Sequence, residues 1–161
     1  MILRHARPAA LVLACMVAAL SCTTPGIPDA PSDPSKELYA ASLGVDIPHM
    51  QKTTRAVYYS DKTVGTGATL SSSTAVVIDF VLNLPDATQI SAQNAVSIKM
   101  SDIEVAGLPE GMLGTGATGG MKVGGTRLIV IGSALGYGNH SHLNIPANST
   151  LVYTVTLKSF Q

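Results

Sequence analysis

The sequence predicts a domain of the α+β class, with β-strands as its main elements. Over residues 151–158 apolar and more polar side chains alternate, which is the period of a strand with one buried and one solvated face. Residues 127–131 are largely apolar on both faces, so they are expected to form a strand in the middle of the sheet. A second alternating run, at residues 74–84, places five apolar side chains on one face: Val76, Ile78, Phe80, Leu82 and Leu84.

The first 21 residues have the layout of a secretory signal. Arg4 and Arg7 supply a positive region, residues 8–20 are apolar, and Ser21 and Cys22 follow. The end of this stretch resembles a bacterial lipobox, which would make Cys22 the lipidated N-terminus of the mature chain. Plain cleavage near the same point is the alternative. Cys15 would be removed with the signal, so the mature chain would hold no cysteine pair for a disulfide.

Residues 22–52 are predicted to be a lipidated N-terminus and a tether. Proline, serine, threonine and aspartate dominate residues 23–36, which leaves too few apolar side chains for a core. This composition fits a tether that holds a domain away from a membrane, or a structureless tail of a soluble exported protein. A short helix is expected near residues 38–43. The folded domain is predicted to cover residues 53–161.

The strands of that domain are expected in the following order. Residues 56–64 form the first strand and run into a glycine turn. Residues 74–84 form the second, which ends at Pro85 and Asp86, and residues 95–105 hold the third. The two strands at residues 127–131 and 151–158 complete the set. Between these two, glycines on both sides of Tyr137 allow a tight turn that presents the tyrosine ring from a loop.

Three sequence blocks carry a family resemblance. Met121-Lys-Val-Gly-Gly-Thr-Arg-Leu, Leu135-Gly-Tyr-Gly and Ile145-Pro-Ala-Asn-Ser-Thr-Leu-Val-Tyr resemble, in order and spacing, the C-terminal half of FKBP-type peptidyl-prolyl cis-trans isomerases. The resemblance implies a curved antiparallel sheet of about five strands with one short helix against its concave face. The family places that helix at residues 108–120, which are rich in glycine here. Each interior glycine costs about 0.8–1 kcal/mol relative to alanine, so a shortened or irregular helix is expected.

Composition and motifs exclude several other functions. Ten basic and ten acidic residues balance, and without a basic block nucleic-acid binding is not expected. Residues 114–119 match GxGxxG, but a strand rather than a helix is expected to follow, which argues against dinucleotide binding. His140 and His142 lack a further Cys/His cluster, so solvated loop histidines are expected and no metal is predicted. No nucleophile-elbow pattern or paired carboxylates suggest hydrolysis, and no cofactor is expected.

The resemblance also implies an activity and a set of pocket residues. Prolyl isomerisation needs neither metal nor nucleophile, because the barrier is amide resonance of about 18–20 kcal/mol, which an apolar pocket with a few donors can lower. The family's pocket tyrosine corresponds to Tyr137. Its strand aromatics correspond to Phe80 and Tyr153, and its other wall positions to Ile90, Ser91 and Ile145. Its floor tryptophan, counted back from Met121, falls on Gly114, with Gly111, Met112 and Leu113 just before it.

Three functions follow from these correspondences. The first is a prolyl isomerase that assists the folding of exported proteins from the periplasmic face of the outer membrane, because Thr23 after the cysteine is not an inner-membrane retention aspartate. The second is a peptide-binding module with weak or no catalysis, which glycine at position 114 and serine at position 91 favour. The third is a structural surface lipoprotein. In each case the partners would be proline-containing segments or other proteins, with the membrane reached through a lipid anchor only.

Overall fold

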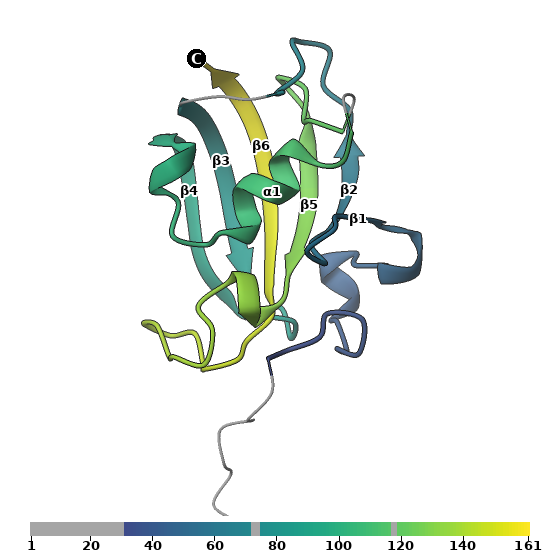
Figure 1. The fold of residues 1–161 in the computed structure, drawn as a ribbon, viewed down its shortest axis with the longest axis vertical. Helices are drawn as coiled ribbons and strands as arrows, with labels where there is room; N and C mark the ends of the chain where they lie inside the picture. The colour runs from purple at the N-terminus through teal and green to yellow at the C-terminus, as the bar shows by residue number, and fades with distance from the viewer. Residues whose placement is uncertain (1–30, 72–74, 117–118) are drawn as a thin grey trace, which may run out of the picture.

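The computed structural model describes residues 31–71, 75–116 and 119–161; the predicted secretory signal and Cys22 lie outside them. The described chain forms a six-stranded sheet in which all paired strands are antiparallel (Figure 1). The strands are β1 (Gln51–Lys52), β2 (Tyr58–Thr63), β3 (Ala75–Asn83), β4 (Gln89–Lys99), β5 (Thr126–Ile131) and β6 (Leu151–Phe160). Their order across the sheet is β1-β2-β5-β6-β3-β4. The predicted α+β class with an antiparallel sheet is confirmed.

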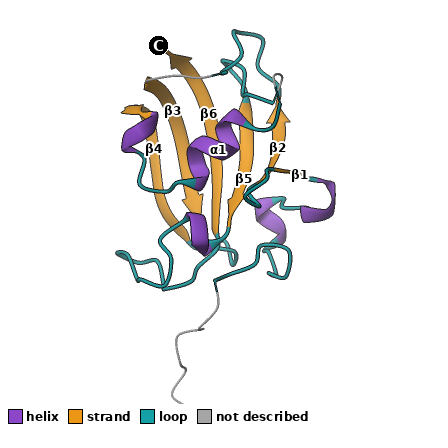
Figure 2. Cartoon of the chain, in the orientation of Figure 1, coloured by secondary structure: helices purple, strands orange, loops and turns teal. Residues whose placement is uncertain are grey.

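The helix α1 (Gly107–Leu113) crosses one face of the sheet, which curves around it (Figure 1). The described residues also contain four short 3₁₀ turns (Figure 2): η1 (Ala41–Leu43), η2 (Ile47–His49), η3 (Met100–Asp102) and η4 (Ser133–Leu135). No helix among the described residues is long and apolar enough to cross a membrane.

Glycines explain both the shortness of α1 and its position. A Cβ atom at Gly107 would lie 2.4 Å from Ile131 Cγ2, and one at Gly111 would lie 2.4 Å from Ile129 Cγ2. The two glycines, one turn apart, therefore form the face on which the helix packs closely against β5. The helix ends at Gly114, whose φ of 61° belongs to the left-handed region that favours glycine. The predicted helix at residues 108–120 is thus confirmed as a single shortened element.

Four strands lie where the sequence predicts them, namely β2, β3, β5 and β6. β5 has β2 on one side and β6 on the other, so its predicted place in the middle of the sheet is confirmed. The apolar face predicted for β3 packs into one hydrophobic core together with α1.

The strand predicted at residues 95–105 is wrong in its bounds. β4 runs from Gln89 to Lys99, and the chain turns into η3 at Met100. A bulge opposite Asp79 interrupts the pairing with β3; there Ala95 has a φ of 52° and its N–H donates to Asp79 Oδ1 at 2.8 Å. The first half of this edge strand is mostly polar and exposed, so it carries no alternation that a sequence pattern could detect.

The tether prediction needs correction over residues 31–52. On the sheet face opposite α1, a second core is formed by Leu43, Tyr58, Leu128, Val130 and Val152, and Tyr39, Val45, Ile47 and Met50 pack against it. At its start the same segment is fixed to η4, because Ser32 and Ser133 each donate a backbone N–H to the other's Oγ at 2.8 Å. The packed unit therefore begins well before Thr53, and only η1 represents the helix expected near residues 38–43.

Candidate active site

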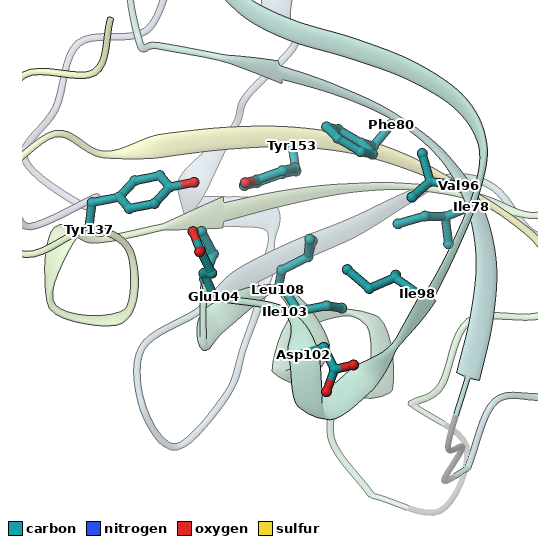
Figure 3. A pocket seen from close by; sticks show the side chains of 11 residues that line it. Ile78, Phe80, Val96, Ile98, Asp102, Ile103, Glu104, Leu108, Tyr137 and Tyr153 are labelled. Carbon is teal, nitrogen blue, oxygen red and sulfur yellow. The ribbon is translucent and has the colours of Figure 1, made fainter. Parts of the chain in front are cut away.

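A cavity of about 340 Å³ opens on the concave side of the sheet, between β3, β4, β6 and the start of α1 (Figure 3). Its lining is apolar on the sheet side and carries polar groups at the loops. The lining residues are Ile78, Phe80, Val96, Ile98, Asp102, Ile103, Glu104, Val105, Leu108, Tyr137 and Tyr153.

Two aromatic rings from neighbouring strands form one wall. Phe80 on β3 and Tyr153 on β6 have ring centroids 6.0 Å apart at an interplanar angle of 52°. This tilted arrangement is a favourable aromatic contact, worth about 0.5–1.5 kcal/mol beyond area burial. The two rings therefore present a largely apolar wall to the cavity.

Tyr137 enters the cavity from the loop after η4. Gly138 has a φ of 66°, its N–H donates to the Ser133 carbonyl at 2.9 Å, and its own carbonyl accepts from Asn148 N–H at 2.8 Å. The Tyr137 ring stacks on His142 with centroids 4.2 Å apart and an angle of 5°. Figure 3 shows the Tyr137 hydroxyl pointing into the cavity toward the hydroxyl of Tyr153. The loop thus holds a hydrogen-bond donor over an apolar hollow.

A phenol is protonated at neutral pH even in water, and the surroundings of both tyrosines strengthen this preference. Burial is the main cause that raises the pKa of Tyr137, and the negative charge of Glu104 raises it further. Burial also raises the pKa of Tyr153, with smaller contributions from Tyr137 and Glu104. Each phenol therefore stays protonated at neutral pH.

The structure brings three of the predicted site residues together: Phe80, Tyr137 and Tyr153 all line the cavity. Three others lie elsewhere. Ile90 is on β4 and packs against the main core, Ser91 pairs with Leu82 across β3 and β4, and Ile145 is buried in the core with 2% of its surface exposed. None of these three is among the cavity-lining residues.

The predicted floor of the pocket is corrected. Met112 is fully buried, Leu113 packs against the core, and Gly114 ends the helix; none of them, and not Gly111, lines the cavity. Leu108, in the first turn of α1, lines it instead. Counting back seven residues from Met121 reaches Gly114, at the C-terminal end of α1, whereas Leu108 lies in the first turn of the helix.

Sequence reasoning also missed the wall from β4 and the loop that follows it. Val96 and Ile98 line the cavity from β4, and Asp102 to Val105 line it from the connection to α1. The alternation of Val96 and Ile98 was visible in the sequence, but it did not show which sheet face holds the site. Nothing local in the sequence distinguishes Glu104 from a solvated surface carboxylate.

His142 is partly buried against Tyr137 rather than freely solvated, whereas His140 is exposed. No three His, Cys, Asp or Glu side chains gather in a metal-binding arrangement within residues 31–71, 75–116 and 119–161. The GxGxxG match includes residues 117 and 118, which lie outside the described residues. The described part of it follows α1 and precedes β5, without the strand before and the helix after that dinucleotide binding requires.

The sheet, the crossing helix and the aromatic-walled hollow between them define a small α+β domain with a concave, aromatic-lined cavity. Within that class, the chain belongs to the FKBP-type peptidyl-prolyl cis-trans isomerase family, whose sequence model matches residues 67–158. Two curated relatives are both called FK506-binding protein 4. The one from Chaetomium thermophilum is 32% identical over 126 residues, and the one from Gibberella zeae is 33% identical over 110 residues.

These matches cover 75% and 66% of this chain but only 23% and 21% of the relatives, so the chain corresponds to a small part of those longer proteins. Solved structures agree on the fold. AtFKBP13 is similar with a TM-score of 0.63 and 19% identity, over 70% of this chain and 99% of that one. FkpA from Escherichia coli gives a TM-score of 0.59 and 24% identity, over 70% of this chain and 51% of that one.

Proposed function

We propose that this domain catalyses the cis–trans isomerisation of peptidyl-prolyl bonds. Twisting an X-Pro amide removes its resonance and makes its carbonyl less polar, and the uncatalysed exchange takes tens to hundreds of seconds. A hollow that excludes water favours the twisted, less polar amide over the planar one. Members of the family to which the chain belongs are described as isomerases of this type, which supports the proposal.

The observation that carries the proposal is the Tyr137 hydroxyl above the apolar hollow. The proline ring fits against Phe80, Tyr153 and Leu108, which present apolar surface. Tyr137 donates a hydrogen bond to a substrate carbonyl and so fixes the orientation of the twisted bond. The stack on His142 and the hydrogen bonds at Gly138 hold that donor in place before substrate binds.

Substitution of Tyr137 by phenylalanine tests this role. The protein beginning at Pro31 is expected to accelerate isomerisation of a short proline peptide, and Tyr137→Phe is expected to lower kcat/KM about five- to tenfold, since it removes one hydrogen bond. Tyr58→Phe makes the same chemical change on the opposite sheet face and serves as control. Equal rates for Tyr137→Phe and the unchanged protein would remove Tyr137 from the mechanism. Absence of acceleration by a folded protein that still binds the peptide would favour a peptide-binding module.

We also propose that the chain is exported and anchored in the outer membrane through a lipid on Cys22, facing the periplasm. The apolar run before Cys22 and the lipobox-like Ser21-Cys22 support this location. In a bacterial host, Cys22→Ser is expected to move the protein from the membrane fraction to the soluble periplasmic fraction, measured by fractionation and by the mass of the mature N-terminus. Unlipidated chains cleaved near residue 22 in both proteins would support plain secretion instead.

A further inference from the structure

The charged side chains that line the cavity are all acidic. Asp102 and Glu104 come from the connection between β4 and α1, and no Lys, Arg or His is among the lining residues. Both carboxylates are exposed at the mouth of the cavity, whereas the apolar side chains form its depth. The mouth therefore combines negative charge with an apolar interior.

Neither carboxylate is neutralised by the described part of the protein. Asp102 accepts a hydrogen bond from Ser101 Oγ at 2.8 Å, and neither Asp102 nor Glu104 has an ion-pair partner among the described residues. The lysines on the neighbouring strands do not face these two carboxylates. Lys158 pairs with Asp79 at 2.7 Å, and Lys99 follows the cavity-lining Ile98, so that strand alternation turns it to the other face.

Glu104 lies beside the residues to which we assign substrate binding. Figure 3 shows its carboxylate below the hydroxyl end of Tyr137, with Leu108 to its right. The effect of its charge on Tyr137 and on Tyr153 agrees with this position. A substrate side chain next to the proline therefore passes close to Glu104 on its way out of the cavity.

We infer that the site selects proline segments with a lysine or arginine directly before or after the proline. The proline ring occupies the apolar interior, and the flanking cation remains at the mouth, where it meets Glu104 and Asp102 with little desolvation. An acidic flanking residue is repelled by the same two carboxylates. This inference rests on the proposed function, because it assigns the substrate class of that site.

The test measures kcat/KM of the full chain for two series of short peptides of one length. In the first series the residue before the proline is lysine, glutamine or glutamate. In the second series the same three residues follow the proline. In at least one series the lysine peptide is expected to be favoured over the glutamine peptide about two- to fivefold, as for an exposed ion pair, with the glutamate peptide lowest. The preference should shrink in high salt, because exposed charges are screened.

Variants assign the preference to the two carboxylates. Glu104→Gln combined with Asp102→Asn is expected to bring the lysine-to-glutamate ratio of kcat/KM close to one. Asp46→Asn removes an exposed carboxylate from the loop between η1 and η2 and is expected to leave the ratio unchanged. Equal kcat/KM for the three peptides in both series, or a ratio that persists in the double variant, would overturn the inference.

The failure of this inference is distinguishable from failure of the proposed function. If no peptide is isomerised, the proposed activity is lost, and the same peptides are compared by dissociation constant with the same variants. Tighter binding of the lysine peptide that depends on Glu104 and Asp102 would then still support the charge selection. Equal binding of the three peptides would reject it.

Discussion

A chain shortened to residues 53–161 is expected to lose most of its stability, although the sequence predicts that this range is the complete domain. Residues 31–52 cover a hydrophobic face whose central side chains, Leu128, Val130 and Val152, are at most 1% exposed. Each large apolar side chain returned to water costs about 1.5–3 kcal/mol, and a whole domain is stable by only about 5–15 kcal/mol. The shortened chain should therefore unfold at much lower urea concentration than residues 31–161, or bind a dye for exposed apolar surface.

Two leucines in residues 31–52 test whether this segment stabilises the protein through its packing or merely through its added length. Leu43 is 8% exposed and belongs to the covered core, whereas Leu38 is 90% exposed. Leu43→Ala is expected to lower the free energy of unfolding by about 2–3 kcal/mol, because it leaves a partial cavity in the core. Leu38→Ala is expected to leave the free energy of unfolding almost unchanged. Equal urea midpoints for the shortened and longer chains would show that the segment rests on the sheet without stabilising it.

The misplaced boundary shows what sequence pattern does and does not determine. β5 and β6 are central strands, and their continuous or alternating apolar side chains identify them directly. The segment at residues 31–52 holds Tyr39, Leu43 and Ile47 among prolines and polar residues, with no helical or strand period. Such a segment packs against a surface formed by residues far away in the sequence, here β2, β5 and β6. A local sequence pattern does not show these contacts.

The candidate site likewise contains residues that the sequence predicts and residues that only the fold identifies. Tyr137 could be predicted because a tyrosine between two glycines in a loop has little packing reason of its own. The aromatic wall of Phe80 and Tyr153 could be predicted because the family resemblance assigns both to the pocket and strand alternation places both on core faces. Leu108 could not be found by counting back from Met121, because that count ends at Gly114, the C-cap of α1, and Leu108 lies in the first turn of the helix. Glu104 is an ordinary exposed acid until the fold brings it beside Tyr137.

Arg127→Met is expected to destabilise the protein by about 1.5–3 kcal/mol, the range for hydrogen bonds to a charged group, because the Asp61 side chain is 33% exposed and the ion pair is only partly buried. The Arg127 side chain is 2% exposed and binds both Asp61 carboxylate oxygens, through Nε at 2.7 Å and Nη2 at 3.0 Å. Its Nη1 faces the carbonyls of Gly111, Met112 and Gly119 at 3.0, 3.3 and 2.8 Å. Methionine fills much of the space but removes the Arg127 donor from these oxygens and the carboxylate, although the Met112 carbonyl keeps the Met121 N–H at 2.9 Å.

The consequence extends to the cavity, because two of the three carbonyls belong to the C-terminal end of α1. Helix-terminal carbonyls lack partners within the helix, and in α1 Arg127 supplies a donor from β5. The opposite end of the same short helix carries Leu108 into the cavity, so a loosened C-terminal end is expected to raise KM for a proline peptide as well as lower the urea midpoint.

Three further variants test whether the geometry or the charge of the Arg127 side chain accounts for its contribution to stability. Arg127→Lys keeps the charge but lacks the planar fork, so an intermediate loss of stability is expected. Asp61→Asn combined with Arg127→Met should cost less than the sum of the single changes, because both remove the same contact. Lys122→Met deletes an exposed cation and is the matched control. Additive losses at Asp61 and Arg127, or an Arg127→Met midpoint equal to that of Lys122→Met, would show that the pair does not hold α1 to the sheet.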